Sequence, residues 1–309
     1  MPLLQHIAGR AYYIPGANNL GVVATGDGGA IAIDTGLDKD TGRLIRKALD
    51  EAGLALRAIV NTHHHADHIG GNDYLLRNLP GVEIYAPRLE AALIENPILE
   101  PIYLNMGAAP IPALQNKWIM AKGAPVHHVI DGERLAIAGV ELEIVSLPGH
   151  SLNQVGVAVD GACFAADGFF GPAILAKHGI PYAQDVGAQL GSLDRLAARG
   201  DLYFLPGHGD LTPRDALEDL LAANQAAVER GTQIVREALA AAEKQSLDAI
   251  ARRVRRALDL NLFAIPQYAI FVSVVTAHLG YLESQGLAQV ALEEDGMLWR
   301  ATAAEGAAG

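Results

Sequence analysis

Residues 62–68 read Thr-His-His-His-Ala-Asp-His and hold four of the chain's eleven His. They follow an apolar run that is typical of a buried strand, and a helical pattern resumes directly after them. In a tight loop, the alternating side chains of His63 and His65 can point the same way and bind one metal ion, while Asp67 and His68 turn toward a second position. Imidazole nitrogens and carboxylate oxygens suit Zn²⁺ and also Fe or Mn. The stretch therefore predicts a metal site rather than a solvated turn.

The composition of the 309 residues is that of a globular protein, with 50% hydrophobic and 19% charged residues. The single Cys argues against a disulfide scaffold and fits a reducing, intracellular setting, so metal chemistry here must rely on imidazole and carboxylate groups. The net charge of −12 disfavours nucleic acid and anionic membranes as partners. No apolar run approaches a membrane span, and the first residues lack the pattern of a signal peptide. We expect a mature, soluble, cytoplasmic protein.

Three more candidate ligands lie where other predicted strands end, and each is next to a Gly: His150, Asp167 and His208. Functional side chains converge at strand ends in layered α/β proteins. A single His or Asp at a strand end is usually a turn residue. Three of them, together with the histidine-rich loop (residues 62–68), favour one shared metal site.

The remaining apolar runs predict an α/β fold made of two sheets. The Gly-Asp-Gly-Gly turn at residues 26–29 separates two β-rich segments, which is typical of a hairpin. A helix is predicted over residues 39–52, with Gly53 as its stop. Two strand-rich halves with helices outside them indicate a sandwich of two sheets covered by helices. The predicted strands are residues 20–25, 30–34, 56–61, 82–86, 140–147, 154–159, 162–166 and 202–205.

Residues 90–125 interrupt this alternation with five Pro among apolar side chains. A long segment of this kind is more typical of a lid or pocket wall than of disorder. Its apolar side chains would favour a substrate with an acyl group over a highly charged one. The side chains in question are Ile102, Met106, Ile111 and Trp118.

The character of the sequence changes after residue 212, which divides the chain into a catalytic domain, residues 1–212, and a smaller helical domain, residues 213–309. Helices are expected over residues 215–242, from the N-cap Ser246 onward, and over residues 269–284. Two strands, residues 287–292 and 297–302, then flank a Glu-Glu-Asp-Gly turn. Three helices followed by a β-hairpin is the order of a winged helix.

These motifs resemble those of the metallo-β-lactamase-fold hydrolase superfamily, and the match runs from about residue 10 to residue 212. The resemblance implies a four-layer αββα sandwich with two metal ions. It places the first ion on His63, His65 and His150, the second on Asp67, His68 and His208, and makes Asp167 the bridge between them. The C-terminal part resembles the winged-helix domain that is appended to one branch of the superfamily.

Two acidic residues refine this resemblance. Asp167 stands at the bridging position, where the β-lactamases known for antibiotic hydrolysis carry another residue. The chain is therefore more similar to the glyoxalase II, lactonase and ribonuclease-like branches, and weak β-lactam hydrolysis would be a side activity at best. Asp34 resembles the family's acidic residue that accepts a hydrogen bond from a ligand imidazole, but it could equally turn the chain and cap the next helix. Cys163 lies within a predicted strand, and we expect it in the core.

The expected chemistry is hydrolysis of a small ester, thioester or lactone. Two zinc ions hold a water and lower its pKa from 15.7 toward about 7, so that hydroxide attacks the substrate carbonyl at neutral pH. Asp67 and Asp167 would be the catalytic carboxylates, and Asp67 could carry the proton to the leaving group. Lys177, His178 and Tyr182 could line the pocket and bind the substrate, although a Lys-His pair in a loop is usually only solvated.

The sequence is also compatible with other functions. A phosphodiesterase or endoribonuclease is favoured by four Arg on one predicted helix, at positions 252, 253, 255 and 256. Residues 211–309, however, hold 9 Lys and Arg against 13 Asp and Glu, so these Arg are more simply an exposed face or a homodimer contact. A mononuclear-iron persulfide dioxygenase would need only part of the ligand set. The last alternative is an assembly module with a vestigial site.

Overall fold

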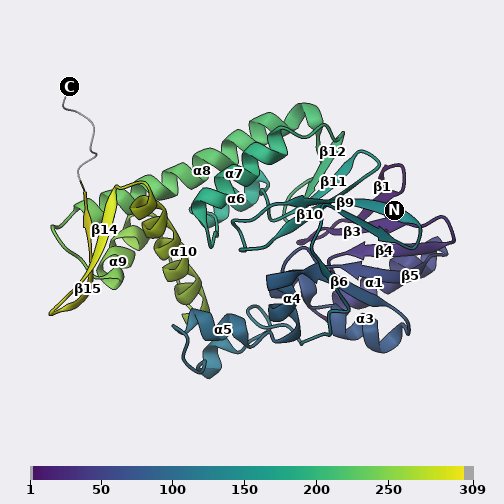
Figure 1. Cartoon of the computed structure of the whole chain (residues 1–309), viewed down its shortest axis with the longest axis horizontal. Coiled ribbons are helices and arrows are strands. Elements are labelled where there is room, and N and C mark those ends of the chain that lie inside the picture. Colours follow the sequence, from purple (N-terminus) through teal and green to yellow (C-terminus); the bar gives the residue numbers. More distant parts are fainter. Residues whose placement is uncertain (1–2, 303–309) are drawn as a thin grey trace.

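The computed structural model describes residues 3–302, apart from the side chain of His178. Two sheets pack face to face, and helices cover their outer faces (Figure 1). The first sheet has the order β1-β2-β3-β4-β5-β6-β7, antiparallel up to β4 and parallel from β4 to β7. Its strands are Gln5–Ala8, Ala11–Ile14, Leu20–Ala24, Gly29–Ile33, Ala55–Val60, Glu83–Pro87 and His128–Ile130.

The second sheet has the order β13-β12-β11-β10-β9-β8, and only its β11–β12 pair is parallel among these strands. In chain order from β8, its strands are Arg134–Ile137, Val140–Ser146, Val155–Val159, Ala162–Ala166, Tyr203–Pro206 and Thr212–Pro213. Helices α1 (Lys39–Ala52) and α3 (Asn72–Asn78) cover the first sheet. Helices α7 (Val186–Ala197) and α8 (Arg214–Ala240) cover the second. The predicted αββα sandwich is confirmed.

The central strands are apolar throughout because both of their faces are covered. In β4, Ile31 and Ile33 face the opposite sheet, whereas Ala30 and Ala32 pack under α1. Such strands read as continuous apolar runs rather than alternating ones, which is why the sequence locates them well. Cys163 in β11 is fully buried on the outer side of its sheet, as expected, and burial raises the pKa of its thiol to about 12.

Helix α1 shows how local sequence sets an element's bounds. It spans the predicted residues 39–52, with Asp38 accepting a hydrogen bond from the amide of Asp40 and Gly53 adopting a left-handed φ of 68°. The alternative in which Asp34 caps this helix is therefore wrong. The sequence did not reveal β1 at the edge of the sheet or β2 beside it, because both strands are only four residues long and partly exposed.

The segment between β6 and β7 is a helical insert that contains all of the predicted residues 90–125. It consists of α4 (Arg88–Glu95), α5 (Leu99–Leu104) and the 3-10 turn η1 (Pro112–Leu114). Both α5 and η1 contact the C-terminal helix α10, and Figure 1 shows the end of α10 next to α5. The insert therefore links the sandwich to the C-terminal helices.

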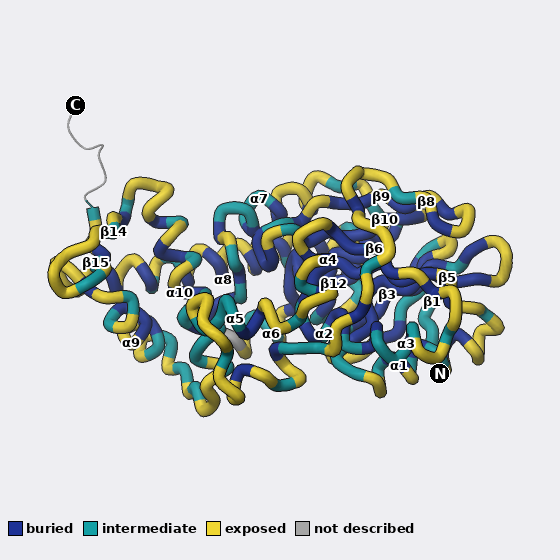
Figure 2. Tube along the Cα trace, turned by 60° about the horizontal axis from the view of Figure 1, so that its bottom comes forward, coloured by how far each residue is buried: buried dark blue, intermediate teal, exposed yellow. Residues whose placement is uncertain are grey.

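The C-terminal part follows the predicted order of three helices and a hairpin. Helix α8 is followed by α9 (Leu247–Ala257), α10 (Ile265–Ser284) and the antiparallel strands β14 (Ala288–Glu293) and β15 (Gly296–Ala301). Ser246 caps α9 as expected, by accepting a hydrogen bond from the amide of Ala249. These elements share a core that includes Val275 and Leu279, and Figure 2 shows buried stretches on the C-terminal helices at a distance from the buried sheets.

Helix α10 is longer than predicted, because Pro266 is tolerated in the first turn of a helix. It is also the one helix among residues 3–302 that is long and apolar enough, by length and composition, to cross a membrane. The expectation that no segment reaches this length is therefore wrong. The buried residues of α10, among them Phe271 and Leu282, pack in the C-terminal core.

Candidate metal centre

The predicted ligands meet at one end of the sandwich, because every segment that carries them follows the end of a strand. The histidine-rich loop follows β5 and leads into the short helix α2 (Ala66–Ile69). His150, Asp167 and His208 follow β9, β11 and β12. The structure thus brings together all seven side chains that the sequence singled out as ligands.

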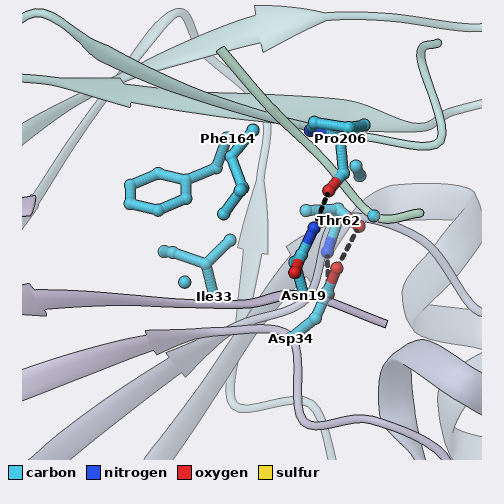
Figure 3. Close-up of a pocket in the computed structure, with 10 residues that line it drawn as sticks. Asn19, Ile33, Asp34, Thr62, Phe164 and Pro206 are labelled. Carbon is cyan, nitrogen blue, oxygen red and sulfur yellow. Dashed lines mark hydrogen bonds between the residues drawn. The ribbon is translucent and has the colours of Figure 1, made fainter. Parts of the chain in front are cut away.

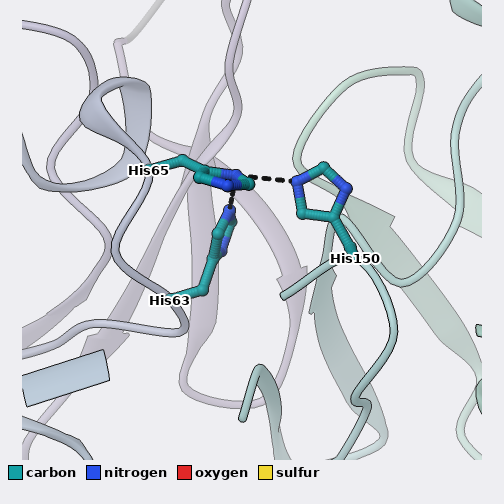
Figure 4. Close-up of side chains that lie close together, drawn as sticks. All are labelled: His63, His65 and His150. Atoms are coloured by element: carbon teal, nitrogen blue, oxygen red, sulfur yellow. Dashed lines mark hydrogen bonds between the residues drawn. The ribbon is translucent and has the colours of Figure 1, made fainter. Parts of the chain in front are cut away.

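Three imidazoles converge on one point. The Nδ1 atom of His65 lies 3.1 Å from Nε2 of His63 and 2.8 Å from Nε2 of His150 (Figure 4). A tetrahedral ion with metal–nitrogen distances of about 2.0–2.1 Å holds its ligand nitrogens about 3.3 Å apart. The three nitrogens therefore have nearly the spacing of three corners of such a site.

A second group lies beside the first, and Asp167 stands between them. The ligand atoms of Asp67, His68 and His208 are within 4.8 Å of one another, with Nε2 of His208 3.1 Å from Oδ2 of Asp67. The Oδ2 atom of Asp167 lies 3.2 Å from Nε2 of His150 and 3.7 Å from Nε2 of His208. One carboxylate thus faces both groups, which is the geometry expected of a bridging ligand.

In four of the imidazoles, the Nδ1 atom, which lies on the side of the ring away from the cluster, is within hydrogen-bond distance of another group of the protein. Nδ1 of His68 donates to Asp34 over 2.8 Å, and Nδ1 of His150 and of His208 lie 3.2 and 2.6 Å from the carbonyls of Tyr182 and Ala17. Nδ1 of His63 lies 3.0 Å from the Thr62 hydroxyl. Contacts of this kind leave the Nε2 lone pair free and aim it at a metal.

The surroundings of two polar atoms in this cluster fit a metal site. Nε2 of His68 and Oδ1 of Asp167 are buried 3.4 Å apart, and neither forms a hydrogen bond with the part of the chain that the structure describes. Buried polar atoms are rarely left without a partner, because each costs about 1–3 kcal/mol. The donor set of imidazole and carboxylate groups fits divalent zinc, iron or manganese.

The pKa shifts differ between the two groups of ligands. Burial, followed by the neighbouring imidazoles, lowers the pKa of His63 and His65 well below the usual range, which keeps both imidazoles neutral. Burial also opposes charge on His208, but Asp167 and Asp67 together raise its pKa to about 9. Although burial opposes ionisation of Asp167, the imidazoles of His208, His68 and His150 hold the pKa of its carboxyl far below the usual range.

Asp34 supports the second group from behind. Its carboxylate accepts from Nδ1 of His68 and also from the amide and hydroxyl of Thr62, at 2.8 and 2.7 Å, and it sits at a left-handed φ of 60°. Asp34 thus forms the hydrogen bond to an imidazole that was predicted for it. A cavity of about 10 Å³ lies behind this carboxylate, between the sheets, and Figure 3 shows residues that line it. It has room for one water and therefore cannot be a substrate pocket.

The sequence missed the residue that ties the ligand loops together. Glu90 of α4 is buried and accepts hydrogen bonds from the amide of His64 (3.1 Å), the hydroxyl of Ser151 (2.7 Å) and the amide of Asn153 (3.0 Å). It also contacts Nδ1 of His64, so this imidazole turns away from the ligand cluster. No sequence pattern marks Glu90, because its partners lie 26 to 63 residues away.

The predicted substrate residues have different surroundings. The ring centroid of Tyr182 lies 5.3 Å from that of His65, whereas Lys177 is exposed on α6 (Pro172–His178). The side chain of His178 lies outside the described residues. Met106 and Trp118 of the insert are 94% and 67% exposed, so neither forms a buried pocket wall.

The geometry can be compared with known proteins. A family model described as the metallo-beta-lactamase superfamily matches residues 13–208, which is more than half of the chain. The chain belongs to the metallo-β-lactamase superfamily. The predicted resemblance, including that to the glyoxalase II branch, is confirmed.

Among its relatives are proteins named hydroxyacylglutathione hydrolase. The one from Thiobacillus denitrificans is 32% identical over 171 residues, which cover 55% of this chain and 52% of the relative. The one from Xanthomonas euvesicatoria is 29% identical over 153 residues, covering 50% of this chain and 47% of the relative. The chain spans about half the length of the curated relatives it matches.

Solved structures are similar over nearly the whole chain. A β-lactamase domain protein from Burkholderia ambifaria has a TM-score of 0.73 and 18% identity, with 97% of this chain and 93% of that chain covered. A metallo-β-lactamase family protein from Thermus thermophilus has a TM-score of 0.66 and 20% identity, with 98% and 99% covered. At these identities the likeness shows the fold, C-terminal helices included.

Proposed function

We propose that this superfamily member is a two-metal hydrolase of small thioesters, with esters and lactones as related substrates. The convergence of five imidazoles and two carboxylates, two of whose buried atoms lack a protein partner, carries the proposal. The hydroxyacylglutathione hydrolases among its relatives, whose name denotes thioester hydrolysis, support the substrate class. Glyoxalase-like chemistry is favoured over β-lactam hydrolysis because Asp167 occupies the place between the two groups.

The seven side chains would hold two ions as the resemblance implies. His63, His65 and His150 form the first site, Asp67, His68 and His208 the second, and Asp167 the bridge. When bound, divalent cations supply an acidified water and polarise a substrate carbonyl. Zinc is the metal we propose, with iron or manganese as alternatives.

Other groups of the protein orient the ligand imidazoles, and one carboxylate is placed to carry a proton. Asp34 and the carbonyls of Tyr182 and Ala17 keep the ligand imidazoles in one tautomer. Asp67 has 37% of its side chain exposed, more than His208 with 19%. Its carboxylate is therefore placed at the open side of the cluster, where it can hold the proton that the leaving group takes up.

The substrate we propose is a small molecule rather than RNA, and the protein is expected to act in the cytoplasm. The arginine cluster of α9 is largely engaged within the chain. Arg252 pairs with Asp248 at 2.7 Å, Arg253 donates to the Gln245 side chain, and Arg255 donates to the carbonyl of Leu260. These contacts leave little of the cluster for phosphates.

The test combines metal content with a substrate panel. The purified protein should contain about two metal ions per chain by mass spectrometry and should hydrolyse a hydroxyacyl thioester faster than a lactone, RNA or a β-lactam. Asp167→Ala should lose metal and activity together, since the bridge is removed, while the exposed Asp194→Ala should change neither. A metal-free, inactive protein, or full activity in Asp167→Ala, contradicts the proposal.

A further inference from the structure

A polar wall stands beside the metal cluster, on the side of His65 and His150. We define it as four residues: Glu100 and Tyr103 from α5 of the insert, and Tyr182 and Gln184 from the segment between α6 and α7. The ring centroid of Tyr182 lies 5.3 Å from that of His65 and 5.2 Å from that of His150. The wall therefore borders the site at which the proposed reaction takes place.

Gln184 sets the direction of the two phenols. Its Nε2 donates to the hydroxyl oxygens of Tyr103 and Tyr182, each over 3.4 Å, and its Oε1 accepts from the amide of Leu152 at 3.1 Å. A phenol oxygen that accepts a hydrogen bond still has its own hydrogen to donate. The Tyr103 hydroxyl lies 3.3 Å from Nε2 of His64, and the ring of Tyr182 borders the cluster.

The wall contains hydrogen-bonding groups but no permanent positive charge. Glu100 is only 8% exposed, and burial, followed by the charge of Asp67, raises the pKa of its carboxyl well above the usual range. Its neighbours in the wall are phenols and an amide. An anion placed here would lose its hydration without gaining a cationic side chain of the wall, which is costly.

The position of α5 is set from both sides. Tyr103 contacts His64 on the cluster side, and α10 of the C-terminal part contacts α5 and η1 on the other. Figure 1 shows α10 reaching from the C-terminal hairpin to α5. The C-terminal helices thus hold the insert half of the wall in place.

We propose that this wall is the subsite for the thiol portion of the substrate, and that it selects an uncharged group that accepts hydrogen bonds, such as an amide, over the carboxylates of a glutathione thioester. The inference rests on the proposed thioester hydrolysis and narrows its substrate class. A neutral amide is desolvated at lower cost than a carboxylate, and the Tyr182 hydroxyl can satisfy its carbonyl. An enzyme built in this way resembles the hydroxyacylglutathione hydrolases in chemistry but differs in the thiol it prefers.

The kinetic test uses two thioesters with the same lactoyl group, one of glutathione and one of N-acetylcysteamine, which is uncharged. We expect kcat/KM of the metal-loaded enzyme to be at least about tenfold higher for the N-acetylcysteamine ester. Tyr182→Phe should raise KM for that ester by about fivefold to thirtyfold, with kcat and metal content little changed. The control Tyr13→Phe removes a hydroxyl that bonds Gln5 on β1, and it should behave as the wild type.

Glu100 offers a change of specificity. Glu100→Lys places an ammonium in the wall and should shift the ratio of kcat/KM values toward the glutathione ester. If this buried substitution prevents folding, Glu100→Gln replaces it: the isosteric amide should retain the wild-type preference for the neutral ester. A wild-type preference for the glutathione ester, or an unchanged KM in Tyr182→Phe, overturns the proposal.

Binding separates this inference from the proposed function. S-methyl-N-acetylcysteamine and S-methylglutathione cannot be hydrolysed, and saturation-transfer NMR reports their binding to the metal-loaded protein. If the neutral compound binds preferentially and Tyr182→Phe abolishes this preference, the proposed subsite is supported. This holds even if neither thioester is hydrolysed, and in that case only the proposed function fails. Equal binding of the two compounds, or binding unaffected by Tyr182→Phe, refutes the wall even if thioesters are hydrolysed.

Discussion

Replacing Glu90 by Gln tests how the metal loops are held. One carboxylate oxygen accepts from the amide of His64 and contacts its Nδ1, and the other accepts from Ser151 and Asn153. His64 lies between two predicted ligands, and Ser151 follows a third. Glu90 therefore joins two loops that are far apart in sequence, and Gln keeps its shape while turning one acceptor into a donor.

The expected loss of stability in Glu90→Gln follows from the hydrogen bonds that Glu90 accepts. In either orientation, the NH₂ group of the Gln side chain faces a backbone amide, that of His64 or that of Asn153, which previously had an acceptor. A buried donor left without a partner costs about 1–3 kcal/mol, so Glu90→Gln should lower the free energy of unfolding by about that amount. Residues that orient metal ligands typically change metal affinity by about 10–100-fold, and we expect the dissociation constant to rise within that range.

Urea unfolding of the metal-free protein measures the first effect, and competition with a chromophoric chelator measures the second. Glu95→Gln is the matched control, because Glu95 lies on the same helix but is exposed and accepts one hydrogen bond, from the amide of Val126. The control should change the free energy of unfolding by less than about 1 kcal/mol. If Glu90→Gln and Glu95→Gln have the same stability and the same metal affinity, Glu90 does not hold the loops.

Three further predictions concern the site and the C-terminal core. Gly207→Ala should lower metal stoichiometry measured by mass spectrometry, because a Cβ there would lie 2.3 Å from Oδ1 of Asp167; the outcome that contradicts this is full loading. Asp34→Asn should weaken zinc binding by about 10–100-fold in a chelator competition, since the amide no longer fixes the tautomer of His68, and unchanged affinity would show that Asp34 only turns the chain. Burial lowers the pKa of His278 to about 4 in the folded protein, below the ordinary value of 6.5. The unfolded chain therefore binds the proton first, so this His should remove stability as the pH falls from about 6.5 to 4, by up to about 3 kcal/mol. Comparing urea unfolding of the metal-free wild type and His278→Leu at pH 7.5 and 4.5 should show the wild type losing more stability; parallel losses would mean that His278 is not shielded.

Local sequence was sufficient for the elements that carry the ligands. Strands covered on both faces, such as β4 and β11, consist of apolar residues, so they can be found without knowledge of their neighbours. Helix α1 could be bounded because its start and stop signals lie within one turn of its ends. Strands β1 and β2 could not be found in this way, because they are short and partly exposed and depend on their pairing with one another and with β3.

The sequence by itself determined which residues could bind metal. The ability of His and Asp to bind a metal ion is a property of their side chains, and the apolar runs of the strands show where each strand ends. Only the tertiary structure decided what surrounds them. Glu90 reaches Asn153 across 63 positions, Asp34 reaches His68 across 34, and Gln184 reaches Tyr103 across 81. Hydrogen bonds between residues so far apart depend on how the sheets and the insert pack, which no local pattern encodes. Metal binding could therefore be predicted from the sequence, whereas the preference that we propose for an uncharged thiol could be inferred only from the tertiary structure.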